Sequence, residues 1–134
     1  MPIIHSRVWK GVPFTMERNA GKAPGTVIFR LKGPFTARDI FNPQSPDSVR
    51  NLFESHAAPD DAPPALHILD LSDVPYMDSM GLGTIVTLYV RGKGKGIRVI
   101  VAASSPRVLE LLKLTKVDTV LPMAATVEEA ESVQ

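Results

Sequence analysis

The stretch best suited to chemistry is residues 70–83, with the sequence DLSDVPYMDSMGLG. An apolar run ends in the carboxylate of Asp70, a short polar turn follows, and the pair Asp78-Ser79 opens an apolar segment that contains glycines. A hydroxyl beside a carboxylate at the start of a helix can cap that helix, act as a nucleophile, or accept a phosphate group. Ser79 is therefore the first candidate functional residue.

A serine nucleophile needs a base, and its strand–turn–helix form has the pattern G-x-S-x-G. Position 77 is methionine rather than glycine, and no motif places a base for Ser79, because it follows all three histidines, which are His5, His56 and His67. The chain has no cysteine, which excludes a thiol nucleophile and a Cys-based metal site. We therefore predict that the protein is not an enzyme and uses no cofactor.

Composition narrows the class of partner. The 134 residues are 44% hydrophobic and 22% charged, as expected of one soluble globular domain. The net charge of +1 comes without a long run of either sign, so neither nucleic acid nor an anionic membrane is expected as a partner. A transmembrane helix needs about 18 consecutive apolar residues, and no stretch of the sequence is that long. The first residues do not have the pattern of a signal peptide. We expect a cytoplasmic protein.

Hydrophobic periodicity predicts the elements. Residues 26–32 alternate apolar and polar side chains, which indicates a half-exposed strand, and residues 66–71 are nearly all apolar, which indicates a strand buried on both faces. The further strands are expected at 14–18, 98–103 and 117–121. Helices are expected at 46–56, at 79–91, from Pro106 onward, and after Thr126. The glycines of 92–96 are expected to end the second of these helices. Residues 57–64 are expected to form a surface loop.

The order of these elements indicates the fold class. In the second half, strand and helix alternate, which gives parallel strands covered by helices. We predict an α/β fold with a single mixed β-sheet of about four to six strands, parallel in the second half, covered by about four helices. Functional loops of such sheets gather at the carboxyl ends of the strands. Asp78-Ser79 and Ser104-Ser105 both follow a predicted strand there.

The run LDLSDVPYMDSMGLG, the Gly-rich turn after the next helix, and the segments RVIVAASSPRVLELLKL and TVLPMAATVEEA resemble the STAS domain family. This family includes bacterial anti-sigma factor antagonists and the cytoplasmic domains of sulfate transporters. The resemblance covers residues 65–131 well and residues 26–36 more loosely. It implies a STAS-like domain over residues 14–134, preceded by an N-terminal extension of residues 1–13. Trp9 in that extension could pack on the domain or on a second copy in a homodimer.

The resemblance implies a partner-switching protein. In the antagonists, the serine after the Asp is phosphorylated by an anti-sigma factor that is itself a serine protein kinase, and a serine phosphatase resets the switch. The acceptor corresponds to Ser79. The partner-binding positions correspond to the exposed start of the helix and to the neighbouring strand end, at Asp78, Met80, Gly81, Leu82, Thr84 and Ser105.

Two alternatives remain open at the level of sequence. The connection over residues 33–47 is longer than in many antagonists, and Met80 stands where a small hydroxyl residue is commoner. The domain could therefore be a phosphorylation-independent scaffold or a module that binds a small molecule or nucleotide. Asp78 or Ser79 could also serve simply as the helix N-cap.

Overall fold

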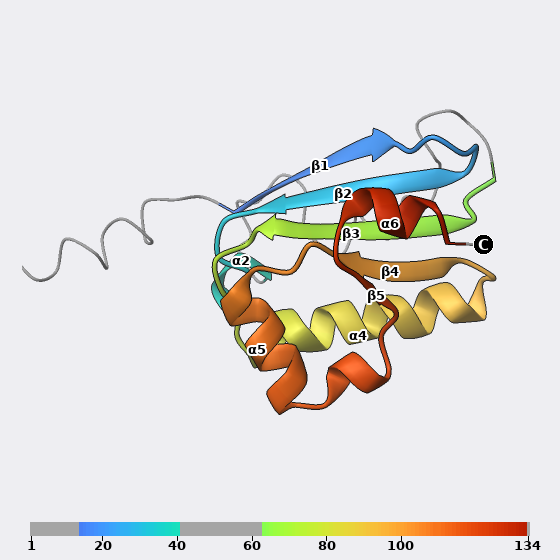
Figure 1. The fold of residues 1–134 in the computed structure, drawn as a ribbon. Helices are drawn as coiled ribbons and strands as arrows, with labels where there is room; N and C mark the ends of the chain where they lie inside the picture. The colour runs from blue at the N-terminus through green and yellow to red at the C-terminus, as the bar shows by residue number, and fades with distance from the viewer. Residues whose placement is uncertain (1–13, 41–62, 134) are drawn as a thin grey trace, which may run out of the picture.

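One mixed sheet of five strands organises the chain, in the order β1-β2-β3-β4-β5. The computed structural model describes residues 14–40 and 63–133. β1 is antiparallel to β2, and the other neighbours are parallel (Figure 1). The strands are β1 (Thr15–Ala20), β2 (Thr26–Lys32), β3 (Leu66–Asp73), β4 (Arg98–Ala102) and β5 (Met123–Ala124), and the helices are α2 (Ala37–Ile40), α4 (Ser79–Gly94), α5 (Pro106–Leu114) and α6 (Val127–Glu131), with a 3-10 turn η1 (Val117–Thr119). The predicted fold class is confirmed.

The strand patterns place the core as expected. In β2, Val27, Phe29 and Leu31 are buried while Arg30 between them is exposed. In β3, the first six residues are buried and the last two are exposed, because the strand lies between β2 and β4 with both faces covered. The alternation and the continuous apolar run therefore predicted these two strands correctly.

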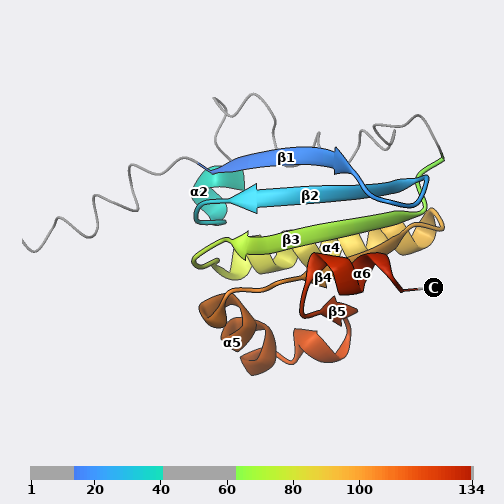
Figure 2. The same cartoon turned by 45° about the horizontal axis from the view of Figure 1, so that its top comes forward.

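Helices cover both faces of the sheet (Figures 1 and 2). The larger hydrophobic cluster lies under α4 and α5 and includes Phe29, Leu69, Ile85 and Leu112. The smaller cluster lies under α6, where Ala130 packs with Ile68 and Ile100 of the strands. The carboxyl ends of β2 and β3 lie near the N-terminal ends of α4 and α5, at one end of the strands (Figure 1).

Helix α4 is longer than predicted. It runs to Gly94 and buries Gly92, which the sequence analysis assigned to the terminating turn. A Cβ atom on Gly92 would lie 2.9 Å from Val99 Cγ2 and 3.0 Å from the Ile97 carbonyl oxygen, so the missing side chain lets the helix pack directly on β4. The buried face also includes Leu88, whereas Val86 and Tyr89 are half-buried.

The strand predicted at 117–121 is wrong. Residues Val117–Thr119 form η1 after Lys116 in the left-handed region (φ 61°), and the strand β5 follows at Met123–Ala124. Apolar side chains at 117, 120 and 121 have helical rather than alternating spacing, and Leu121 is buried by the turn. The predicted helix at 46–56, most of the loop at 57–64 and the extension 1–13 lie outside the described residues.

The cap predicted for the last helix is present. Thr126 is the N-cap of α6, and its hydroxyl oxygen accepts a hydrogen bond from the Glu129 N–H at 3.1 Å. The Glu129 carboxylate in turn accepts from the Ala125 N–H at 3.2 Å, one residue before the usual position of a capping box.

Candidate functional site

The turn between β3 and α4 is fixed by backbone hydrogen bonds to the segment that follows β2. The N–H of Phe35 donates to the Tyr76 carbonyl at 3.1 Å, and the N–H of Asp78 donates to the Phe35 carbonyl at 3.4 Å. Phe35 also bridges Met77 in parallel, and both side chains are buried. The turn that presents Ser79 is therefore bonded through its backbone to the segment after β2, at the carboxyl ends of the strands.

Asp78 caps the helix, which resolves one alternative left by the sequence. Its Oδ1 accepts hydrogen bonds from the N–H groups of Met80 and Gly81, both at 3.0 Å. Its Oδ2 accepts from the N–H of Ala37, the first residue of α2, at 3.0 Å. One carboxylate thus satisfies donors at the starts of two helices.

Ser79 is the first residue of α4 and is exposed. Because Asp78 already caps the helix, the Ser79 hydroxyl is not needed for capping, and it makes no hydrogen bond to the described residues. The Ser79 side chain therefore lies at the surface. The hydroxyl is accessible at the carboxyl ends of the strands, where α4 and α5 begin.

The other residues expected at the exposed helix start divide into two groups. Met80 is 42% exposed, and Thr84 is half-buried with its hydroxyl donating to the Met80 carbonyl at 2.8 Å. Gly81 and Leu82 are buried, so the expectation that they are exposed is wrong. A Cβ atom on Gly81 would lie 2.3 Å from the Phe35 carbonyl oxygen, so this glycine admits the chain's own backbone rather than that of a partner.

The outer face of α4 carries no charge along most of its length. Met80, Gly83, Thr87 and Val90 are exposed on it, and no charged residue occurs between Ser79 and Val90. The Thr87 hydroxyl donates to the Gly83 carbonyl at 2.8 Å, as that of Thr84 does one turn earlier. Thr87 and Val90 were not among the residues predicted for the site, although their helical spacing from Met80 is visible in the sequence. We call Ser79, Met80, Gly83, Thr87 and Val90 the outer α4 face.

Ser105 lies at the neighbouring strand end, as predicted, but its hydroxyl points inward. It occupies the N-cap position of α5, yet the hydroxyl donates to the Val74 carbonyl at 2.6 Å instead of capping the helix. The Arg107 guanidinium lies 5.4 Å from the centre of the Tyr76 ring, a second contact between α5 and the β3–α4 turn. Ser105 is therefore a link between two turns.

The described residues do not assemble a serine nucleophile site. His67 is near the start of the eight-residue β3, whereas Ser79 lies beyond its other end, about 20 Å away at the usual strand rise. His67 is also buried, with its ring 5.1 Å from that of Phe29. Within residues 14–40 and 63–133, no group of His, Asp and Glu side chains could hold a metal ion.

A family model for the STAS domain matches residues 17–130. The chain belongs to the STAS domain family. Solved structures with this fold include an anti-sigma factor antagonist from Mycobacterium paratuberculosis (21% identity, TM-score 0.65, covering 87% of this chain and 90% of that one). The phosphorylated form of the Bacillus cell fate determinant SpoIIAA matches at 20% identity and a TM-score of 0.59, covering 87% and 95%.

A sulfate transporter family protein from Wolinella succinogenes also shares the STAS fold, at 16% identity and a TM-score of 0.62, with 85% of this chain and 86% of that one covered. In the described part of the present chain, no helix is long and apolar enough to cross a membrane. The shared fold therefore includes proteins of two functional classes, and the choice between them depends on the residues of the site.

Proposed function

We propose that this STAS domain is a regulatory module of the anti-sigma factor antagonist type. It binds an anti-sigma factor with serine kinase activity through the outer α4 face, and phosphorylation of Ser79 ends the binding. A serine phosphatase restores the binding form, and the cycle operates in the cytoplasm. The observation that carries this proposal is an exposed hydroxyl at the first residue of an uncharged helix face, next to a carboxylate that already caps the helix.

The outer α4 face is suited to protein contact because removing water from it costs little free energy. Covering it buries no charged side chain, and the hydroxyls of Thr84 and Thr87 keep their hydrogen bonds to the helix carbonyls when water leaves. Met80 and Val90 offer apolar area at the two ends of the face, with exposed fractions of 42% and 60%. Charged residues are generally depleted from the centres of protein interfaces.

A phosphate on Ser79 would act strongly on such a contact. It adds a charge of about −1.5 to −2 at neutral pH. The Met80 and Gly81 N–H groups, which could otherwise bind a phosphate at the helix start, are already bonded to Asp78. The phosphate charge would therefore add to that of Asp78 at the edge of the uncharged face. A partner docked there would face both repulsion and the cost of desolvating two anions. The phosphorylated Bacillus relative supports a phosphorylatable site on this fold.

The test uses the full chain, isolated with its bound proteins from its own host. Intact-mass and site-mapping analysis should find one phosphate, confined to Ser79, and a serine kinase should co-purify with the unphosphorylated form. Ser79→Ala should abolish the added mass and keep the kinase bound, whereas Ser79→Asp should lose the kinase. Ser72→Ala is the matched control because Ser72 is another exposed serine near the end of β3, and it should behave as the natural protein.

Two results would contradict the proposal. Phosphate that persists in Ser79→Ala would show that another residue is modified. A kinase that binds Ser79→Asp as tightly as the natural chain would show that a negative charge at Ser79 does not end the binding. Absence of phosphate in growth and stress conditions, combined with a partner that Val90→Glu on the outer α4 face releases, would identify a phosphorylation-independent scaffold instead.

A further inference from the structure

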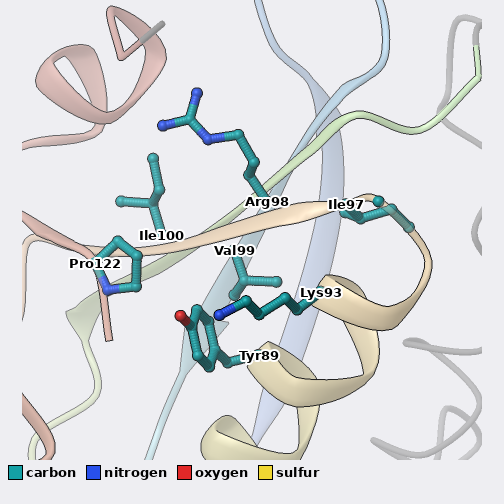
Figure 3. Close-up of a pocket in the computed structure, with 8 residues that line it drawn as sticks. Tyr89, Lys93, Ile97, Arg98, Val99, Ile100 and Pro122 are labelled. Carbon is teal, nitrogen blue, oxygen red and sulfur yellow. The ribbon is translucent and has the colours of Figure 1, made fainter. Parts of the chain in front are cut away.

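A hollow of about 320 Å³ lies at the other end of α4, where the start of β4 is paired with β3 on one side and has no strand on its other side. Arg98 and Ile100 line it on one side of β4, Tyr89, Lys93 and Val99 line it on the other, and Pro122 lies beside the strand (Figure 3). The hollow thus straddles the edge of a strand instead of lying on one face of the sheet. We call it the β4 notch.

Pro122 explains why the strand edge is left open. β5 pairs only with Val101 and Ala102, and the Val101 N–H donates to the Pro122 carbonyl at 3.0 Å. In a parallel ladder, the next bonds toward the start of β4 would require residue 122 to donate an N–H to the Val99 carbonyl. Proline has no N–H, so β5 cannot continue along Val99.

The backbone of Val99 faces this opening. The Arg98 N–H donates to the Ala65 carbonyl on the β3 side at 3.0 Å, and successive residues of a strand direct their N–H and C=O groups to opposite sides. Val99 therefore directs both groups into the β4 notch, where no described residue bonds to them. Val99 is only 3% exposed, and buried backbone groups without partners are costly. A bound backbone would satisfy both.

Cations flank the opening on both faces. Figure 3 shows Arg98 on one side of β4 and Lys93 on the other, with the Lys93 ammonium 5.8 Å from the centre of the Tyr89 ring. Among residues 14–40 and 63–133, no acidic residue lines the notch and neither cation has an ion pair. Because successive side chains of an extended strand point to opposite faces, a chain laid beside Val99 would bring two adjacent side chains to these two cations.

We propose that the β4 notch binds an extended segment of another protein that carries two adjacent acidic residues. The segment adds a short strand to the sheet at Val99, and its two carboxylates pair with Lys93 and Arg98. Strand addition of this kind gives affinity through main-chain hydrogen bonds and selectivity through the alternating side chains. Because Lys93 and Arg98 are positively charged, this selectivity favours acidic segments.

This site is independent of the proposed switch. Ser79 begins the 16-residue helix α4 and Lys93 lies in its last turn, so the two are separated by about 20 Å along the helix axis. Binding in the β4 notch should therefore be the same in Ser79→Asp and in the natural chain. A failed test here would leave the phosphorylation proposal intact, and the converse also holds.

The probe is the peptide acetyl-Thr-Val-Asp-Glu-Val-Thr-amide, titrated into the full ¹⁵N-labelled chain while amide chemical shifts are followed by NMR. We expect saturable shifts that are largest at the Val99 amide and at its neighbours in β4. The double variant Lys93→Glu/Arg98→Glu should bind this peptide at least about tenfold more weakly. It should instead bind the matched peptide with two lysines in place of the acids.

Controls separate strand addition from simple charge attraction. Lys113→Glu makes the same change of charge at an exposed position of α5 and should leave binding unchanged. A peptide N-methylated at its central residues cannot donate to the Val99 carbonyl and should bind at least about tenfold more weakly. The proposal is overturned if shifts do not centre on Val99, if the lysine peptide binds the natural chain equally well, or if glutarate produces the same shifts and affinity. The last result would indicate an anion pocket.

Discussion

The β3–α4 and β4–α5 turns have the same plan and use their serines in opposite ways. Each follows a central strand and carries a serine at the start of a helix. In the first turn, Asp78 caps α4 and Ser79 faces outward. In the second, Ser105 takes the N-cap position, but its hydroxyl bonds inward to the Val74 carbonyl, and Pro106 follows at the first helical position.

The two serines differ in their position relative to the N-cap. An aspartate at position 78 supplies the capping oxygens and moves the serine one place into the helix, where its side chain is free. In the second turn Ser105 itself stands at the N-cap and makes no side-chain cap bond, and the hydroxyl of the preceding Ser104 is buried without a hydrogen-bond partner among the described residues. The third helical residues differ too, because Gly81 admits the Phe35 backbone whereas the corresponding Val108 fills the core.

The largest expected effect comes from giving Gly81 a side chain. Its Cβ would lie 2.3 Å from the Phe35 carbonyl oxygen, so the backbone must shift. We expect Gly81→Ala to lower the free energy of unfolding by about 2–3 kcal/mol in urea denaturation. Gly83→Ala is the control, since no atom lies within 4 Å of its Cβ, and it should raise stability by about 0.5–1 kcal/mol. Equal effects would show that the approach of Phe35 does not require glycine.

Removing the Asp78 carboxylate should have the next largest effect. Asp78→Ala loses three hydrogen bonds at the starts of α4 and α2 and should cost about 2 kcal/mol of unfolding free energy. Asp78→Asn can keep the oxygen that accepts from Met80 and Gly81, but its NH₂ group cannot accept from Ala37. It should therefore cost about 1 kcal/mol. If both variants lose the same amount, the link to α2 carries no stability.

Ser105→Ala tests whether the second turn depends on its serine. The change removes the donor to the Val74 carbonyl and leaves a backbone acceptor without that partner, which should lower the unfolding free energy by about 1 kcal/mol. Ser105→Thr keeps the hydroxyl and serves as the comparison. A loss in Ser105→Thr equal to that in Ser105→Ala would indicate that side-chain shape matters at this position and the hydrogen bond does not.

The smallest effect is expected for Ser79→Ala. An exposed hydroxyl that neither caps the helix nor bonds to the described residues should contribute within about 0.5 kcal/mol to stability. Thermal and urea unfolding of the two serine-to-alanine variants in parallel would give the sharpest form of the comparison. A loss at Ser79 as large as that at Ser105 would mean that Ser79 has a structural role.

Periodicity in the sequence predicted the fold because the two central strands and α4 each carry a strong apolar pattern. It was less successful where the same residue type can have different structural roles in different surroundings. Glycine ends many helices, but Gly92 lies within α4 and lets the helix approach Val99 of β4 closely. The apolar residues of 117–121 were assigned to a strand, although their spacing fits the turn that buries Leu121.

The candidate site was predictable at Asp78 and Ser79 because residue type and position along the chain define a helix start. The bond from Asp78 to Ala37 was not predictable, since it joins residues far apart in the sequence. The burial of Gly81 left no hydrophobic signal because glycine has no side chain. The open edge at Val99 had one signal, which is Pro122 directly before β5, but its meaning depends on the register with β4.

The charges beside Val99 have a consequence for self-association. An uncovered strand edge is a hazard in a concentrated cell, because it can pair with the same edge of another molecule. Two copies that met at this edge would bring Lys93 and Arg98 of one against those of the other, and four positive charges would lie close together. The same two side chains that would attract an acidic segment would thus oppose the pairing of two identical sheets through β4.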